Sequence, residues 1–161
     1  MKRQLFRRLR HEQLERREVL SVAFVEHVVS PSMAGSTSSV QAADIDGDGD
    51  VDVLSGGLSP DEGKLIWHEN TDGDGRFGEE QLISTPGVMR IFAADIDGDG
   101  DADVLAGRTG YCHVTWYENT NGQGGFWNEH LLNGHRDPYG GLALFATDVD
   151  GDGDTDILAA D

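Results

Sequence analysis

The sequence predicts an all-β protein built from a repeated four-stranded unit. An acidic nine-residue stretch occurs three times, starting at Asp44, Asp95 and Asp148, so that successive starts lie 51 and 53 residues apart. A glycine turn occurs twice between these stretches, as E-N-T-D-G-D-G-R-F from Glu69 and as E-N-T-N-G-Q-G-G-F from Glu118. The remaining segments are short apolar runs, which indicate strands, and a repeat of this length is typical of supersecondary units that stack on one another.

The middle unit shows how four strands are expected to follow one another. Met89–Ala94 leads into the acidic stretch and Asp103–Ala106 leaves it. The third strand is expected at His113–Glu118 and the fourth from about Phe126 to Leu132. Asn and Gly tolerate the positive φ of a tight turn, so the segment from Asn119 to Gly122 is expected to join these two strands. Four antiparallel strands in a unit of this length match a β-propeller blade better than a pair of sandwich strands.

The repeat region is expected to span residues 22–161, with units near 24–83, 84–132 and 133–161, the last of them truncated. It opens with Phe24–Ser30, which resembles a fourth strand, and it stops just after the second strand of the last unit. About two and a half to three blades fall short of the four to eight that close a ring. We therefore expect a fragment whose remaining blades belong to a longer chain, or self-association between copies.

Charge is divided between a basic head and an acidic body. The formal net charge is -18, although seven of the 12 Lys and Arg fall within residues 1–18. From Val19 onward, 27 acidic residues face five basic ones. Such a body repels nucleic-acid phosphates and suits multivalent cations. No apolar run approaches the roughly 18 residues of a membrane span, and Cys112 is the only cysteine, so no intrachain disulfide can form.

The spacing D-x-D-x-D-G-x-x-D predicts a cation site in each acidic stretch. Carboxylates at positions 1, 3 and 5 converge, glycine at position 6 permits the sharp turn, position 7 offers its backbone carbonyl and position 9 closes the cage. Oxygen ligands on a flexible loop favour Ca²⁺ over Mg²⁺, which demands tighter octahedral geometry, and over soft metals. Up to three ions are expected, one in each loop, held by Asp44, Asp46, Asp48, Asp50 and Asp52, by Asp95, Asp97, Asp99, Asp101 and Asp103, and by Asp148, Asp150, Asp152, Asp154 and Asp156.

Two other interpretations of the acidic stretches are weaker. An EF-hand or dockerin-like loop needs a bidentate Glu at position 12 and flanking helices, whereas position 12 is Ser55, Ala106 and Ala159 and strand-like residues surround it. A solvated acidic turn explains a single copy better than three copies at the same place of a repeat. Because the carboxylates of each loop repel one another without a cation, we expect calcium to act as a structural staple in place of disulfides.

The unit A-A-D-I-D-G-D-G-D-x-D-V-L, followed by W-x-E-N and a glycine turn ending in Phe, resembles the FG-GAP/VCBS repeat over roughly Phe24 to Asp161. The resemblance implies a calcium-stapled β-propeller, similar to the integrin α-subunit head and to many bacterial surface proteins. It implies the five calcium positions of each loop, with Asp50 acting through its carbonyl. We therefore expect a non-catalytic module of an exported or cell-surface bacterial protein, which mediates adhesion or recognises a carbohydrate or protein.

Residues 1–21 form a basic segment of a different kind. No clear apolar core of a signal peptide follows its basic residues. The segment from Leu14 to Ser21, L-E-R-R-E-V-L-S, resembles the short L-E-x-R-x-L-L-S type motif at the N-termini of large bacterial surface proteins, which implies export. Its composition equally fits a disordered or weakly helical tail.

The aromatic residues suggest packing more than ligand binding. Two pairs occupy equivalent repeat positions and are expected to pack between blades, namely Trp67 with Trp116 and Phe77 with Phe126. Trp127 and Tyr139 lie outside that register and are candidates for a binding surface.

No catalytic residue is expected. Cys112 and His113 are neighbours on a strand, so their side chains should diverge instead of forming a nucleophile pair. The segment from His135 to Asp137 is expected to be a solvated loop. The alternative functions are the N-terminal part of a propeller lyase or hydrolase that acts on polysaccharide, with its catalytic residues outside this chain, and a non-functional truncated product.

Overall fold

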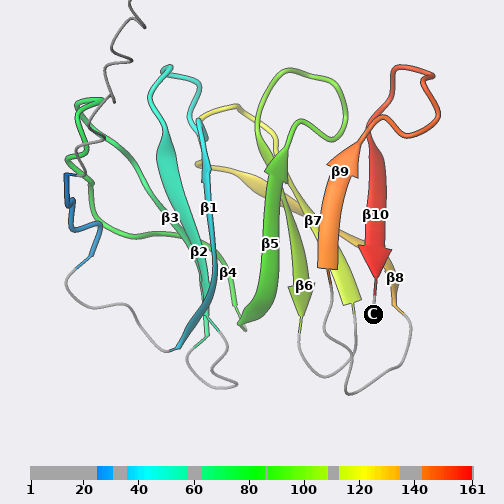
Figure 1. The fold of residues 1–161 in the computed structure, drawn as a ribbon, viewed down its shortest axis with the longest axis horizontal. Coiled ribbons are helices and arrows are strands. Elements are labelled where there is room, and N and C mark those ends of the chain that lie inside the picture. The colour runs from blue at the N-terminus through cyan, green and yellow to red at the C-terminus, as the bar shows by residue number, and fades with distance from the viewer. Residues whose placement is uncertain are drawn as a thin grey trace, which may run out of the picture.

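A computed structural model of the chain describes residues 25–30, 36–57, 63–85, 87–108, 113–134 and 143–160. These residues form ten strands in three antiparallel sheets, which confirms the predicted all-β, blade-like fold (Figure 1). The first sheet has the order β1 Thr37–Ala43, β2 Asp52–Gly57, β3 Leu65–His68 and β4 Gln81–Ser84. The second has β5 Val88–Ala94, β6 Asp103–Arg108, β7 His113–Asn119 and β8 Trp127–Gly134. The third pairs β9 Ala143–Thr147 with β10 Asp156–Ala160.

The sheets repeat one register, so the sequence repeat is also a structural repeat. The residue that ends the first strand faces the ninth residue of the acidic stretch in each sheet, as the pairs Ala43–Asp52, Ala94–Asp103 and Thr147–Asp156 show. The tryptophans of the third strands likewise face equivalent leucines, Leu54 opposite Trp67 and Leu105 opposite Trp116. Because the registers agree, all three acidic loops leave their sheets at the same end (Figure 1).

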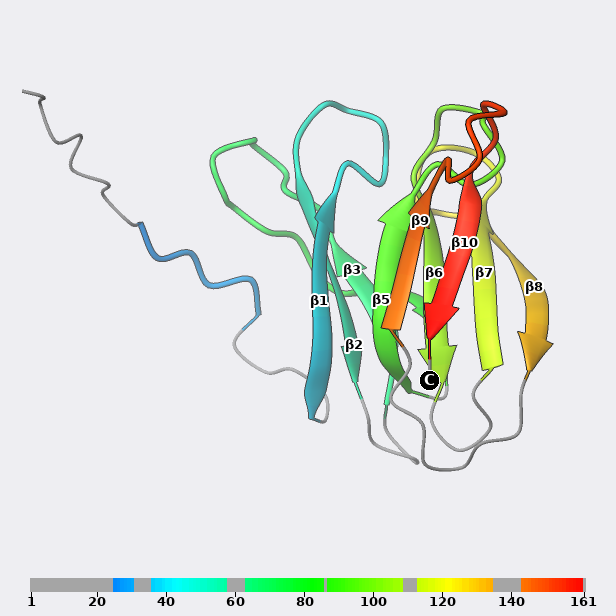
Figure 2. The same cartoon turned by 45° about the vertical axis from the view of Figure 1, so that its right-hand side comes forward.

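The sheets stand beside one another, with β1 next to β5 and β5 next to β9 (Figure 2). Apolar side chains fill the space between the first two sheets, and Leu54, Trp67, Val104 and Tyr117 are almost fully buried there. A second cluster, around Leu105, joins the second and third sheets. Blade-to-blade packing of this kind removes apolar surface from water, which is the main favourable term in folding.

Two expectations about individual segments were wrong. Residues 25–30 form no strand, because no described strand lies alongside them to complete a ladder, and Val25 and Val28 are exposed. Phe126 is 70% exposed and does not pack between blades. The next residue, Trp127, packs against the core instead, and its indole N–H donates to the Gly124 carbonyl at 2.9 Å. Residues 1–24, Cys112, Tyr139 and 135–137 lie outside the described residues.

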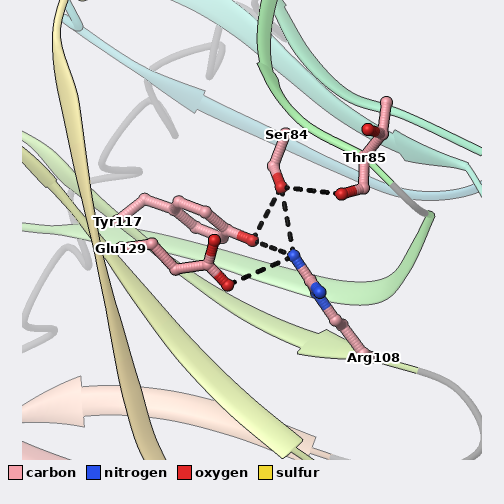
Figure 3. A network of polar contacts seen from close by, with 5 residues as sticks. All are labelled: Ser84, Thr85, Arg108, Tyr117 and Glu129. Carbon is pink, nitrogen blue, oxygen red and sulfur yellow. Dashed lines mark hydrogen bonds and ion pairs between the residues drawn. The ribbon is translucent and has the colours of Figure 1, made fainter.

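A polar network ties β4 of the first sheet to the second sheet (Figure 3). The Tyr117 hydroxyl donates to Ser84 Oγ at 2.9 Å and accepts a hydrogen bond from Arg108 Nη2. Arg108 Nη2 also donates to Ser84 Oγ at 3.1 Å and lies 3.5 Å from Glu129 Oε1. The Tyr117 ring is buried in the core between the sheets, so the network anchors its hydroxyl at the edge of that core.

We expect Tyr117→Phe to lower the free energy of unfolding by about 1 kcal/mol, because it keeps the ring and removes only the bridging hydroxyl. Urea unfolding of the wild type, Y117F, S84A and the double variant measures this effect. Since both residues belong to one network, the double variant should lose less than the sum of the single losses. Strictly additive losses would contradict a bridge between the two sheets.

Candidate metal centre

Each acidic loop gathers three carboxylates at one point. In each group the candidate ligand oxygens lie within 4.8 Å of one another. The groups are Asp44, Asp46 and Asp48 in the first loop, Asp95, Asp97 and Asp99 in the second, and Asp148, Asp150 and Asp156 in the third. Positions 1, 3 and 5 therefore converge in the first two loops, whereas the third loop brings together positions 1, 3 and 9.

Backbone hydrogen bonds give the loops this shape. In the first loop, Asp44 accepts the N–H groups of Gly47 at 2.8 Å and of Gly49 at 3.0 Å through its two oxygens. Asp46 and Asp48 each accept the N–H of the residue two positions later. Gly49 has a φ of 94°, a left-handed conformation that a residue with a Cβ adopts only with strain. The other two loops repeat the bonds to the position 1 carboxylate, so the turn is a property of the motif.

The ninth acid of the first two loops is buried and acts as a latch. Asp52 accepts the N–H of Ile45 at 2.9 Å and the N–H of Asn70 at 2.8 Å. Asp103 accepts the equivalent pair, from Ile96 at 3.2 Å and Asn119 at 2.8 Å. These carboxylates are 0% and 1% exposed and are not among the converging groups of their loops. Each one fastens its acidic loop to the end of the third strand, and a direct role in holding an ion stays a prediction.

The seventh acid of the first two loops points its side chain away from the converging oxygens, toward the neighbouring glycine turn. A Cβ placed on Gly73 would lie 2.6 Å from an Asp50 carboxylate oxygen, and one placed on Gly122 would likewise meet the carboxylate of Asp101. The two glycines have φ values of 66° and 59°, a left-handed conformation that favours glycine at these positions. The direction of these two side chains fits the expectation that Asp50 and Asp101 contribute backbone carbonyls. That contribution stays a prediction.

The electrostatics of the loops favour a cation. Burial raises the pKa of Asp46, and the negative charges of Asp48 and Asp44 raise it further, against a lowering contribution from the backbone N–H of Asp48. Burial also raises the pKa of Asp52 and Asp103, and partial desolvation raises the pKa of the exposed Asp97 in the same direction. A cation among the converging oxygens would stabilise the ionised carboxylates and oppose the pKa shifts of Asp46 and Asp97. The residues therefore fit a hard divalent ion in both geometry and donor chemistry.

Sequence reasoning missed the role of two asparagines, Asn119 at the end of β7 and Asn70 two residues after the end of β3. Asn119 was expected to contribute only turn chemistry and Asn70 was given no separate role, yet they are 0% and 6% exposed. Each donates its backbone N–H to the buried acid of its own loop, and its side-chain oxygen accepts a glycine N–H of the following turn. The signal was present in the sequence, since both glycine turns keep E-N-T while the two residues Asp72 and Asp74 become Asn121 and Gln123.

Comparison with known families decides the classification. The model of the FG-GAP-like repeat matches residues 44–106 and again residues 95–159. The chain belongs to the FG-GAP-like repeat family. Both matches to the FG-GAP-like repeat begin on the first aspartate of an acidic loop, which places the converging carboxylates at the start of each matched unit. No curated protein and no solved structure matches the chain. Within the described part of this FG-GAP-like repeat protein, no helix has the length and apolar character needed to cross a bilayer.

Proposed function

We propose that this FG-GAP-like repeat chain is a non-catalytic calcium-binding module, with one Ca²⁺ in each acidic loop. The observation that carries the proposal is the convergence of three carboxylates to within 4.8 Å in each of three equivalent loops. Carboxylate and carbonyl oxygens on a glycine-containing loop suit Ca²⁺, which accepts six to eight oxygen ligands in flexible geometry. Zinc is a poorer candidate, because the groups contain no Cys or His.

The calcium acts as a structural staple. Each loop joins the first two strands of its sheet, and the ninth acids of the first two loops fasten them to the third strand. A bound ion neutralises repulsion among the converging acids and so favours the folded hairpin. Because an unfolded chain does not hold these oxygens together, the binding free energy becomes folding free energy.

The biological role that we propose is adhesion or ligand recognition by an exported or cell-surface bacterial protein, with a carbohydrate or a protein as the ligand. The family match supports this role, as does the resemblance of the segment from Leu14 to Ser21 to a surface-protein motif. A rigid scaffold that presents loops at one end of its sheets suits recognition, because binding residues gather on loops held by regular structure (Figure 1).

Calcium stoichiometry tests the proposal. The wild type is expected to bind three ions in a calorimetric titration, and Asp97→Ala is expected to bind two, because it removes one converging carboxylate of the second loop. Asp74→Ala is the matched control, since Asp74 is an exposed acid in a glycine turn outside the three groups. Three ions in D97A, or the loss of one ion in D74A, would show that the ligands are assigned to the wrong residues.

A further inference from the structure

One buried side chain joins the first two acidic loops across the boundary between their sheets. Asn119, at the end of β7, donates from Nδ2 to the carbonyl of Ile45 in the first loop at 2.8 Å. The same nitrogen lies 3.3 Å from the carbonyl of Ala102, which ends the second loop. Its backbone N–H is held by Asp103, the buried acid of the second loop. Asn119 therefore contacts both loops at once.

The backbone N–H, the carbonyl and the side chain of Ile45 are all held by neighbouring residues. Its N–H donates to Asp52, its carbonyl accepts from Asn119, and its side chain is 1% exposed. The turn that follows Asn119 also reaches this point, because a Cβ on Gly124 would lie 2.9 Å from Ile45 Cγ2 and 2.5 Å from the Trp67 ring. The position of the first loop therefore depends on the ordered end of β7, and that end depends on the second loop through Asp103.

The equivalent asparagine of the first sheet provides a comparison within the same molecule. Asn70 makes the same contacts inside its own sheet, with its N–H on Asp52, its Nδ2 on the Val51 carbonyl at 3.2 Å and its Oδ1 on the N–H of Gly75. Among the described residues it makes no hydrogen bond to another acidic loop. The two asparagines thus differ in one bond, the one that crosses from Asn119 to Ile45.

We infer that the first and second loops bind calcium with positive cooperativity, transmitted through Asn119. The inference rests on the proposed calcium binding. An ion in one loop orders that loop and, through Asn119, also restrains the other loop. The second ion then binds with a smaller entropic cost of ordering, which is sufficient for positive coupling. The effect is reciprocal, since each ion must change the affinity for the other by the same factor. The described residues provide no such bridge between the second and third loops, so the third loop binds independently of this coupling.

Electrostatics between the loops acts in the opposite direction. Each loop carries five acidic residues, so an ion in one loop reduces the negative potential that attracts an ion to the other. The grouped acids of the second loop are exposed, and added salt screens the interaction between exposed charges. The bond from Asn119 is buried and is not screened in this way. Cooperativity is therefore expected to increase as salt is added, and a single hydrogen bond accounts for a coupling of about fivefold.

Nuclear magnetic resonance can follow the loops separately, because each contains a glycine at position 6, namely Gly49, Gly100 and Gly153. The Gly100 amide signal during a calcium titration gives the dissociation constant of the second loop. We expect Asp46→Ala, which disables the first loop, to weaken calcium binding at the second loop about fivefold in high salt. Asp150→Ala disables the third loop instead and should leave the second unchanged. These two variants change loop residues and leave the buried core intact.

Substitution of the two asparagines tests whether Asn119 transmits the coupling between the first and second loops. In an Asn119→Ala background, Asp46→Ala should no longer weaken the second loop, whereas in the matched Asn70→Ala background the fivefold effect should remain. If N119A does not fold, the dissociation constants of the second loop in D46A and D150A still show whether the first and second loops are coupled. Equal dissociation constants at Gly100 in the wild type, D46A and D150A overturn the inference while leaving calcium binding intact. Absence of calcium-dependent signals from all three glycines of the wild type overturns the proposed function itself.

Discussion

Replacement of Asp103 by alanine is expected to lower the free energy of unfolding by about 3 kcal/mol or more, even without calcium. The carboxylate is 1% exposed and accepts two backbone N–H groups, from Ile96 and Asn119. Its removal leaves both donors buried without a partner, at about 1–3 kcal/mol each. It also leaves a cavity at the junction of the loop and the third strand. Urea unfolding of the wild type and D103A in excess chelator measures the loss.

Asp99→Ala is the matched control for this prediction. Asp99 belongs to the same loop but is exposed, and its carboxylate accepts one N–H, from Asp101 at 2.9 Å. We expect D99A to change the calcium-free stability by no more than about 1 kcal/mol, because exposed groups exchange their hydrogen bonds with water. Equal losses in D103A and D99A would show that the buried acid has no latching role.

Local patterns predicted the parts of the fold that depend on neighbours in sequence. The turn glycines and the short apolar runs were sufficient to place β5, β6, β7 and β8 to within a few residues. The spacing of Asp44, Asp46 and Asp48 was sufficient to predict convergence, since alternating residues of a tight loop direct their side chains to one side. A period near 50 residues then predicted stacked sheets, because a lone sheet cannot bury its apolar face.

Contacts between distant residues were not predictable in the same way. The bond from Asn119 to Ile45 spans 74 residues, and nothing in the E-N-T turn shows that the sheet before it supplies the acceptor. The burial of Asp52 and Asp103 was also missed, because the motif alone presents the ninth acid as an ion ligand and does not show which backbone groups surround it. The expected strand at Phe24–Ser30 failed for a related reason: an apolar run becomes a strand only beside a partner, and the described residues supply none.

Removal of calcium is expected to have the largest effect of all. One independent site contributes about 2.7 kcal/mol when free calcium is 100 times its dissociation constant, so three sites contribute about 8 kcal/mol. That amount is comparable with the whole stability of many domains. Chelation should therefore lower the melting temperature by many degrees, which thermal melts with calcium and with excess chelator measure. Magnesium should replace calcium poorly, because it loses its bound water reluctantly and demands octahedral geometry.

We propose that the acidic loops of this FG-GAP-like repeat protein bind calcium in the folded state and not in the unfolded chain. The most direct test is urea unfolding at a series of buffered free calcium concentrations above the dissociation constants. Each site should add about 1.4 kcal/mol of unfolding free energy per tenfold increase in calcium, so three sites predict a slope of about 4 kcal/mol per decade. The same free energy of unfolding in chelator and at every calcium concentration would contradict the claim.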